Sequence, residues 1–309
     1  MQAFLQANLP FILAGISVGG QYALIAIGYT MVYGILRLIN FAHGDVFMVA
    51  GLVMVYTTAA LPIYISIPIV LVATVLLGLL IERVAYKPLR SAPRMSVMIS
   101  AIGVSYLLQN CALYFTGGLP QVYPEIPFLS RSVTIFGATT KMVTVITPIL
   151  TIILVVLLVL LINHTKIGMA MRAVSKDFET SQLMGVRINS VISVTFAIGC
   201  FLAAVGSLLY FTNYTSVIPT SGAMPGLKAF VAAVFGGIGS IPGAVVGAFI
   251  IGIAENLIKG LDIILFKLGV IAAPAGLATF SDAFTFALLI VILAVKPTGL
   301  FGEKITDKV

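Results

Sequence analysis

Long apolar runs separated by short polar segments make up most of this 309-residue chain. The runs that contain no Asp, Glu, Lys or Arg are residues 1–36, 46–81, 96–115, 142–163, 188–227, 229–254 and, more briefly, 283–295. A helix needs about 20 apolar residues to cross the hydrocarbon of a bilayer. Transmembrane strands would alternate between apolar and polar residues, and the run at 142–163 does not. The pattern therefore predicts an all-α polytopic membrane protein with about eight spans, nine being the alternative.

One of these runs is too long for a single crossing. As one helix, residues 46–81 would extend about 54 Å, whereas the hydrocarbon core is about 30 Å thick. Pro62 and Pro68 offer a break, because proline cannot continue a helix. We expect two helices joined by a tight turn outside the cell. This arrangement places residues 37–45, RLINFAHGD, at the cytoplasmic side or dipping into the membrane.

The distribution of basic residues predicts the orientation. Lys and Arg gather at 82–95, at 164–190 and in the tail from residue 296, whereas 116–141 is rich in Gly, Pro and Thr and has only two basic residues. Cytoplasmic loops of membrane proteins carry an excess of Lys and Arg. We therefore expect the three basic segments, including the C-terminus, in the cytoplasm. The loop at 116–141 and the N-terminus are expected outside.

Composition agrees with a bilayer as the main surroundings of the chain. It is 60% hydrophobic and 9% charged, with a mean hydropathy of +1.16, whereas a soluble domain is about a quarter charged. The net charge of +7 is explained by the cytoplasmic loops, so we expect no nucleic-acid partner. Because no linker interrupts the sequence, we expect residues 1–309 to form one transmembrane domain.

Small residues recur at a regular spacing within the C-terminal half of the chain. Gly239, Gly243 and Gly247 fall every four residues. Small residues at this spacing let two helices in lipid approach closely, so we expect these glycines to pack helices together. A subunit interface or a pore-lining helix is the alternative. Pro242 within the pattern predicts a break or kink, and a broken helix in a membrane needs protein or a water-filled path around its free backbone groups.

Polar residues close to the apolar runs are candidates for a translocation path, because an ionisable group at membrane depth is a functional candidate. These candidates are Asn40, His43, Gly44, Glu255 and Asn256. The alternative is that the first three are solvated in a loop and that the last two bond a neighbouring helix. A stand-alone secondary transporter would place ionisable groups in mid-span, and Asp45, Glu255 and Asp282 are the candidates for that role.

Signatures of catalysis are lacking in the sequence. The two histidines, His43 and His164, are far apart, and neither HExxH, CxxC nor the phosphate loop GxxxxGK[ST] occurs. These patterns supply the ligands of zinc sites and the cradle of nucleotide phosphates. We therefore expect no catalytic residue, no metal site and no cofactor in this chain, and no ATP hydrolysis by the chain itself.

A polar island, residues 164–190, stands between two apolar runs. Met171, Val174 and Phe178 are spaced three and four residues apart, which predicts a short helix with one apolar face. Gly185 suits the end of such a helix. The island is either an ordinary solvated loop or a docking helix for a soluble partner.

Several stretches resemble one family of transport proteins. They are GGQYALIAIGYTMVYGILRLINFAHGD, IERVAYKPLRSAP, SAIGVSYLLQN, the polar island, GLKAFVAAVFGGIGSIPGAVVGAFIIGIAENL and KPTGLFG. Together they resemble the LivH-type permeases of bacterial ABC importers for branched-chain amino acids, from about residue 10 to residue 302. The motifs NFAHG at 40–44 and ERVAYKPLR at 82–90 carry most of the resemblance.

The resemblance implies an ABC importer permease fold in a bacterial inner membrane. It implies a second, LivM-like permease subunit, two cytoplasmic ATPase subunits that use ATP and Mg, and an extracytoplasmic binding protein that delivers the substrate. The polar island is then similar to the coupling loop that contacts an ATPase. Arg172, Ala173, Asp177 and Gly185 match the family's pattern there, while the Glu-Ala-Ala box of many other importers is absent.

The substrate implied by the resemblance is a branched-chain amino acid, Leu, Ile or Val. Similar permeases serve urea, short amides or other amino acids, and the binding protein makes the selection. The sequence displays no obvious charged pocket for a zwitterion, which fits a permease without a tight site of its own.

Overall fold

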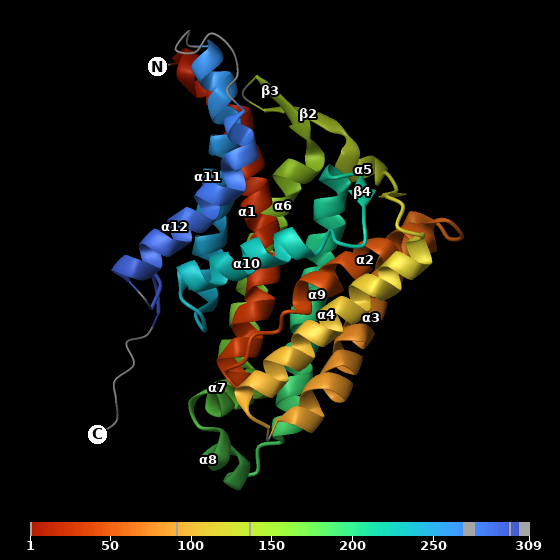
Figure 1. Ribbon diagram of the computed structural model, residues 1–309, viewed down its shortest axis with the longest axis vertical. Coiled ribbons are helices and arrows are strands. Elements are labelled where there is room, and N and C mark those ends of the chain that lie inside the picture. Colours follow the sequence, from red (N-terminus) through yellow and green to blue (C-terminus); the bar gives the residue numbers. More distant parts are fainter. Residues whose placement is uncertain (1, 91, 136, 268–275, 297, 303–309) are drawn as a thin grey trace.

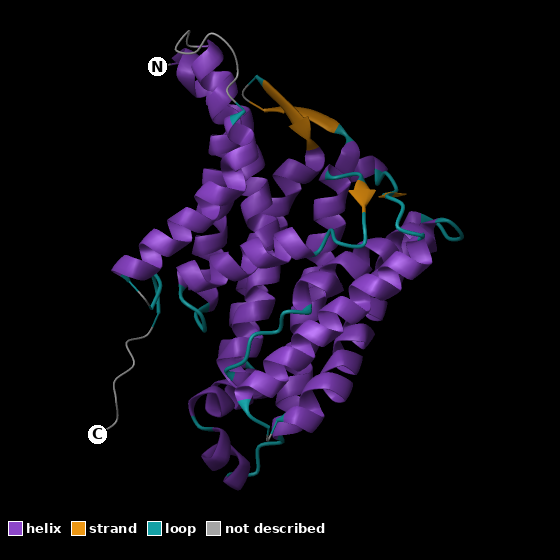
Figure 2. Cartoon of the chain, in the orientation of Figure 1, coloured by secondary structure: helices purple, strands orange, loops and turns teal. Residues whose placement is uncertain are grey.

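The structure is a computed structural model that describes residues 2–90, 92–135, 137–267, 276–296 and 298–302. Helices make up most of it (Figure 2). The helices of the N-terminal half are α1 (Gln2–Leu36), α2 (His43–Thr58), α3 (Ile63–Ile81), α4 (Arg94–Thr116), α5 (Pro127–Ser130) and α6 (Met142–His164). Those that follow are α7 (Lys166–Lys176), α8 (Phe178–Leu183), α9 (Ile188–Asn213), α10 (Ala223–Gly236), α11 (Ile241–Lys267) and α12 (Ser281–Val295). The prediction of an all-α fold is confirmed.

The remaining elements are short. A π-helical turn, Glu82–Tyr86, and a 3-10 turn, Lys87–Leu89, continue α3, and another 3-10 turn, Leu277–Phe280, precedes α12. Two antiparallel strand pairs join β1 (Gln121–Val122) to β4 (Ser216–Val217) and β2 (Ser132–Ile135) to β3 (Ala138–Lys141). The β2–β3 hairpin lies at the same end of the molecule as the start of α1, whereas α7 and α8 lie at the opposite end (Figure 1).

Within the described residues, seven helices are long and apolar enough to cross a membrane. They contain residues 8–36, 63–89, 95–116, 142–164, 188–213, 241–261 and 278–295. Two further helices, α2 with 16 residues and α10 with 14, are shorter. The described residues therefore form seven full-length helices and two shorter ones. The prediction of about eight spans is close to this number.

The predicted break within residues 46–81 is confirmed at Pro62. Helix α2 ends at Thr58 and α3 begins at Ile63, with Pro62 extended at its N-cap position (φ −60°, ψ 147°). Pro68 lies inside α3 and does not interrupt it. The region from 225 to 296, which glycines and charges made ambiguous, forms α10, an uninterrupted α11 and α12.

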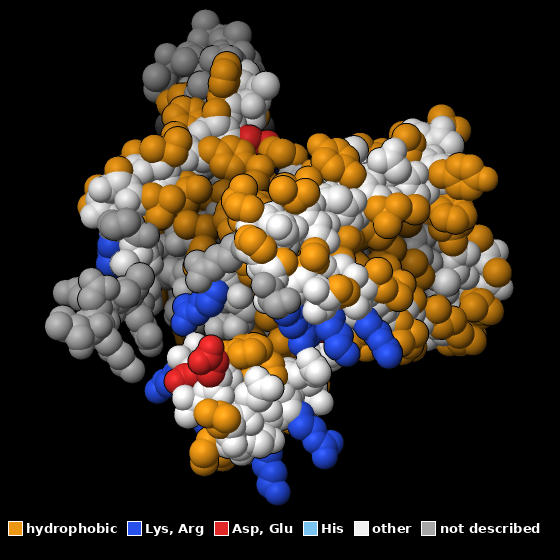
Figure 3. Space-filling view, turned by 60° about the horizontal axis from the view of Figure 1, so that its bottom comes forward, with side chains coloured by type: hydrophobic (Ala, Val, Ile, Leu, Met, Phe, Trp, Pro, Cys, Tyr) orange, Lys and Arg blue, Asp and Glu red, His pale blue; other side chains and the backbone are white. Residues whose placement is uncertain are grey.

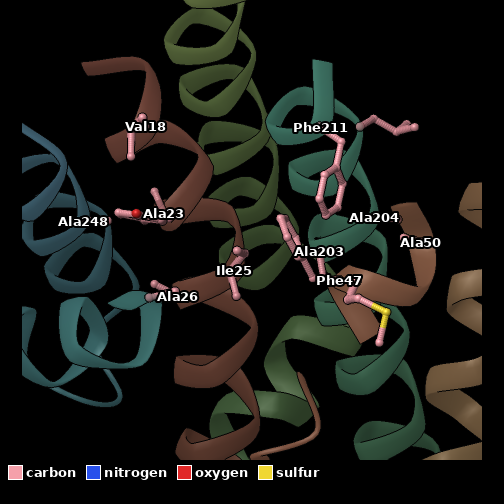
Figure 4. Packing of buried hydrophobic residues seen from close by; sticks show 14 of the residues in the cluster. Val18, Ala23, Ile25, Ala26, Phe47, Ala50, Ala203, Ala204, Phe211 and Ala248 are labelled. Atoms are coloured by element: carbon pink, nitrogen blue, oxygen red, sulfur yellow. The ribbon is translucent and has the colours of Figure 1, made fainter. Parts of the chain in front are cut away.

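Helix α1 is the centre of the bundle. It packs against α6, α9, α10 and α11, and its middle turns are fully buried. Figure 4 shows why these helices fit so closely, since the side chains at the contacts include Ala23 and Ala26 of α1, Ala203 and Ala204 of α9 and Ala248 of α11. Small side chains at an interface allow helix backbones to approach each other in lipid.

Glycines bring α1 and α11 into backbone contact. A Cβ added at Gly15 would lie 2.7 Å from Cα of Ile253, and one at Gly19 would lie 2.8 Å from Cα of Phe249. On α11, a Cβ at Gly252 would overlap the backbone of Gly19. The four-residue spacing of Gly15 and Gly19 thus marks the face of α1 that receives α11.

The glycine pattern at 239–247 is used for packing at two of its three positions. Gly243 and Gly247 face α10, where an added Cβ would overlap the carbonyl oxygens of Gly236 and Ala232. Gly239 was wrongly expected to pack helices. It lies in the connection between α10 and α11 with φ at +98°, and among the described residues nothing lies within 4 Å of a Cβ added there.

The helix break in this region precedes the proline. Helix α10 ends at Gly236, and Pro242 is the second residue of α11. Proline is tolerated in a first helical turn, because its missing N–H would have no partner there. Pro242 therefore starts α11 and does not kink it.

The outer surface divides into an apolar flank and a basic end. Large hydrophobic side chains are exposed along α3, α4, α6 and α12, as expected of helices that face lipid. Figure 3 shows Lys and Arg side chains gathered at the end that carries α7 and α8. The two basic segments at 82–95 and 164–190 thus lie at one end, and 116–141 at the other, while the side of the membrane on which each end lies stays a prediction.

We expect Gly252→Val to destabilise the protein, because the backbone of Gly19 leaves no room for a branched side chain. The free energy of unfolding should fall by about 1–3 kcal/mol. The measurement is thermal unfolding of the purified protein in detergent. Gly103→Val in α4 is the matched control, since none of the described residues places an atom within 4 Å of a Cβ added at Gly103, apart from its own helix turn. Equal stability of the two variants would contradict this account of the α1–α11 contact.

Candidate functional site

Two short helices begin in the middle of the bundle and meet at their first turns (Figure 1). A Cβ at Gly44, in the first turn of α2, would lie 2.7 Å from the carbonyl oxygen of Gly222 and 3.0 Å from Cα of Gly226. Gly222 is the N-cap residue of α10, and Gly226 lies in its first turn. Helices that begin at membrane depth are common at the transport sites of membrane proteins, where protein or water must cover their free backbone groups.

The segment that leads into α2 connects three parts of the molecule. The hydroxyl of Tyr86 donates to Oδ1 of Asn40 at 2.7 Å, and both side chains are buried. This bond joins the two sequence motifs NFAHG and ERVAYKPLR. Arg37 has a left-handed backbone (φ +54°), and its guanidinium donates to the carbonyl oxygen of Ser175 in the last turn of α7 at 3.2 Å. The segment therefore links α1 and α2 to the polar island.

His43 and Asp45 are buried in the first turn of α2. The imidazole of His43 lies against Gly28 of α1, and the ring of Tyr29 meets it edge-on at a centroid distance of 5.1 Å. Within the described residues, Nε2 of His43 has no hydrogen-bond partner. The carboxylate of Asp45 accepts hydrogen bonds from Ser105 and Gln109 of α4. The predicted residues Asn40, His43 and Gly44 thus lie together, and protein covers them in this conformation.

Glu255 lies in a second polar group, which four helices build. Its carboxylate accepts a hydrogen bond from Tyr22 of α1 at 3.0 Å and pairs with Lys228 of α10 at 2.8 Å and with Lys259 of α11. Lys228 also pairs with Asp282 of α12 at 2.6 Å. We call Tyr22, Lys228, Glu255, Lys259 and Asp282 the ion-pair cluster. Asn256 does not join it, because its amide donates to the carbonyl oxygen of Gly252 in its own helix.

The ion-pair cluster is a buried group of charges that the sequence analysis did not bring together. Sequence reasoning missed Lys228, although this residue is the sole charge between the runs at 188–227 and 229–254. A lone charge inside 67 residues that otherwise lack one is the signal that was available. Its partners lie 27 and 54 residues further on, and a pairing over such distances is not readable from spacing.

The C-terminal motif KPTGLFG closes the end of α10 inside the bundle. The N–H groups of Leu300 and Phe301 donate to the carbonyl oxygens of Phe235 and Gly236, both at 2.9 Å. The last carbonyls of a helix have no partner within the helix. The motif supplies hydrogen-bond donors to these carbonyl oxygens, which lipid chains cannot do.

The polar island folds into two short helices that meet at Asp177. The carboxylate of Asp177 accepts from the N–H of Thr180 at 3.0 Å and caps α8. Gly185 (φ +84°) donates its N–H to Gln182, and the next N–H donates to Ser181. This pair of bonds is a Schellman motif, which ends many helices at glycine.

The expected apolar face of the island is split between two roles. Met171 and Val174 are buried against the bundle and anchor α7, whereas Phe178 lies on α8 and is 40% exposed. The prediction of one continuous face was wrong, because Asp177 interrupts the helix. The most exposed apolar side chains of the island are Leu183 (87%) and Met184 (79%), which the sequence pattern did not single out.

The other two predicted coupling residues lie on α7. The guanidinium of Arg172 donates to the carbonyl oxygen of Ile162 at 2.7 Å and to Oδ1 of Asn163, which fixes the junction between α6 and α7. Ala173 is exposed to solvent.

The expectation that signatures of catalysis are lacking was wrong on one point, because one hydrolase-like pattern occurs in the sequence, although it is accidental. Residues 15–19, GISVG, match the G-x-S-x-G pattern of serine hydrolases. That pattern requires an exposed serine on a sharp turn between a strand and a helix, whereas Ser17 is buried inside α1. Among the described residues, no group of three or more His, Cys, Asp or Glu side chains is placed to hold a metal ion.

Comparisons with known proteins agree with this arrangement. The family described as "Branched-chain amino acid transport system / permease component" matches residues 11–293. The high-affinity branched-chain amino acid transport system permease protein LivH of Escherichia coli is 40% identical over 310 residues, and that of Salmonella typhimurium is 39% identical over 309. The corresponding protein BraD of Pseudomonas aeruginosa is 36% identical over 308 residues. Each alignment covers 96% of this chain and 96% of the relative.

A family match over most of the chain and near-complete alignment with three such relatives settle the membership. This chain belongs to the family of permease components of branched-chain amino acid transport systems.

Proposed function

We propose that this chain is the membrane-spanning permease subunit of an ATP-driven importer and that it passes Leu, Ile and Val across the bacterial inner membrane. The printed names of the relatives, which concern branched-chain amino acids, support the substrate. The basic end of the molecule, with α7 and α8, faces the cytoplasm in this proposal, in accord with the excess of Lys and Arg there. The C-terminus lies on the same side, although residues 303–309 are outside the described part.

The proposed importer contains four further subunits. A LivM-like permease pairs with this chain in the membrane, two ATPases bind the cytoplasmic face, and a binding protein brings the substrate from outside. The chain itself is not an enzyme and binds no cofactor, because ATP and Mg are used by the ATPases.

The observation that carries the proposal is the position of the polar island. Helices α7 and α8 stand outside the bundle (Figure 1), anchored by Met171 and Val174, and expose the apolar side chains of Leu183 and Met184 at the end of α8. Such side chains on a rigid helical projection give a soluble partner a surface to bind. Arg172, Ala173, Asp177 and Gly185 belong to this coupling loop.

A chain of contacts leads from the island to the middle of the membrane. Movement of α7 would reach the segment at 37–42 through the bond between Arg37 and Ser175. That segment continues into the first turn of α2, where Gly44 touches the first turn of α10. ATP binding shifts the permease between inward-facing and outward-facing states to the extent that the ATPases favour one of them. In this mechanism Asn40, His43 and Gly44 lie on the route between the ATPases and the path.

The direct test is isolation of the tagged chain from native membranes in mild detergent, followed by mass spectrometry and uptake assays. We expect two ATPases and a second permease to co-purify, and the reconstituted importer to take up leucine with its binding protein. Repeated isolation of the chain alone would overturn the importer. Uptake of urea or acetamide without uptake of leucine would overturn the substrate and leave the importer intact.

We expect Gly185→Arg to abolish uptake while the subunit stays in the membrane. A bulky residue with a left-handed backbone would distort the end of α8 where the ATPase docks. Gly137→Arg is the matched control, because Gly137 also has a left-handed backbone (φ +86°) and open surroundings but lies in the β2–β3 hairpin at the other end. ATP-driven uptake is measured for both. Normal uptake by Gly185→Arg would contradict the coupling role.

We expect Arg37→Gln to reduce the amount of leucine transported per ATP hydrolysed by a factor of about 2–10, the size of effect that the loss of one hydrogen bond has on an equilibrium. The ATPases would still bind the island but would move the segment at 37–42 less effectively. Arg83→Gln serves as the control, since Arg83 is an exposed arginine at the same end of the molecule. If both variants keep the wild-type ratio, the route through Arg37 is wrong.

A further inference from the structure

The ion-pair cluster places four charged side chains of balanced sign beside the central helix. Lys228 and Glu255 are almost fully buried, with 7% and 1% of their side chains exposed. Removing charges from water is costly unless each is paired and hydrogen-bonded. Here Lys228 and Lys259 balance Glu255 and Asp282, so the cluster carries no net charge at neutral pH.

The two carboxylates of the cluster have different surroundings. Glu255 is held by Tyr22, Lys228 and Lys259, and none of these contacts depends on α12. Asp282 has Lys228 as its ion-pair partner, and 40% of its side chain is exposed. Glu255 therefore fixes the ammonium group of Lys228 in place, while Asp282 contacts the same ammonium group from α12.

Helix α12 is the least buried of the long helices that build the cluster. Only 11% of the residues in the apolar stretch that includes α12 are buried, whereas 72% of those in the apolar stretch of α1 are buried. Figure 1 shows α12 slanting away from the rest of the bundle. A shift of α12 would separate Asp282 from Lys228 without breaking the bonds that hold Glu255.

We infer that Lys228 and Asp282 bind the charged backbone of the transported amino acid, Lys228 its carboxylate and Asp282 its ammonium group. The inference rests on the proposed function and names the residues that handle the substrate. The zwitterion enters between the two side chains as α12 moves. Glu255 is a positioning residue in this site. Its ion pair with Lys228 orients the ammonium group, and Glu255 itself does not contact the substrate.

The charge balance explains why a zwitterion fits this site. Opening the contact between Lys228 and Asp282 would leave Asp282 without its ion pair and Lys228 with Glu255 alone, a carboxylate that Lys259 already shares. Such a loss of balance is unfavourable away from water. A zwitterion replaces one ion pair by two, so every charge keeps a partner. Urea, amides and sugars have no net charges to offer, and an amine or a carboxylic acid pairs with only one of the two side chains.

The test uses the assembled permeases and ATPases without the binding protein. Any preference for leucine then comes from the membrane subunits and not from the binding protein. Ligand-induced thermal stabilisation is measured with leucine, with leucinamide, which lacks the carboxylate, and with 4-methylpentanoate, which lacks the amine. A ligand that binds the folded state raises its stability. We expect leucine to raise the unfolding midpoint and both analogues to leave it unchanged.

Variants assign the effect to the two residues. Lys228→Gln and Asp282→Asn should lose the shift with leucine and reduce ATP-driven uptake about tenfold or more, as expected for the loss of one charged hydrogen bond. Asp282→Glu should retain the shift. Lys141→Gln is the control, since Lys141 bonds the carbonyl oxygen of Thr212 outside the cluster. Co-purification of the ATPases verifies that each variant assembles.

The outcomes separate this inference from the proposed function. Equal stabilisation by leucine and its analogues, or wild-type uptake by both Lys228→Gln and Asp282→Asn, would overturn the site. If a variant fails to assemble, the site is still tested by comparing the stabilisation of the wild-type importer by leucine with its stabilisation by the two analogues. Failure of the wild-type importer to take up leucine with its binding protein would overturn the proposed function itself.

Discussion

The lack of water in the hydrocarbon of a membrane is the constraint on which this structure depends. Every backbone group and every charge placed there must find its partner within the protein. Long helices meet this demand by themselves, but α2 and α10 begin inside the bundle and α10 also ends there. Gly44 and Gly222 bring the two first turns into contact, and Leu300 and Phe301 complete the end of α10. The interruptions that make a path are thus stabilised by contacts between segments far apart in the sequence.

The same constraint separates a rigid part of the molecule from a part that can change. Helices α1, α9 and α11 are joined by small residues, so their backbones have little freedom to move. Helix α12 has few buried residues, and it reaches the bundle through the ion pair of Asp282 with Lys228 as well as through apolar side chains such as Leu289 and Ile292. The polar island is anchored to the bundle by Met171 and Val174, and Arg37 connects it to the segment that leads into α2. In our account, transport uses these two connections while the central helices keep their arrangement.

Much of the fold was predictable from the sequence, because span length and helix breaks are local properties. The apolar runs predict the long helices, Pro62 marks the turn between α2 and α3, and Gly185 ends α8. Local patterns fail where a partner decides the outcome. Gly239 continues a packing pattern but lies in a connection, and Met171 and Val174 continue a docking pattern but are buried against the bundle. Neither the bond between Tyr86 and Asn40 nor the pairing of Lys228 with Asp282 can be read from spacing, because each joins separate helices.

The central claim is that the end of α8 contacts an ATPase, and crosslinking in native membranes tests it most directly. A photoreactive amino acid is placed at Leu183 and, as the control, at Leu119, which is 67% exposed in the loop after α4 at the opposite end. The account predicts a crosslink from position 183 to an ATPase subunit and none from position 119. No crosslink to an ATPase from 183, with the importer otherwise assembled, would contradict the account.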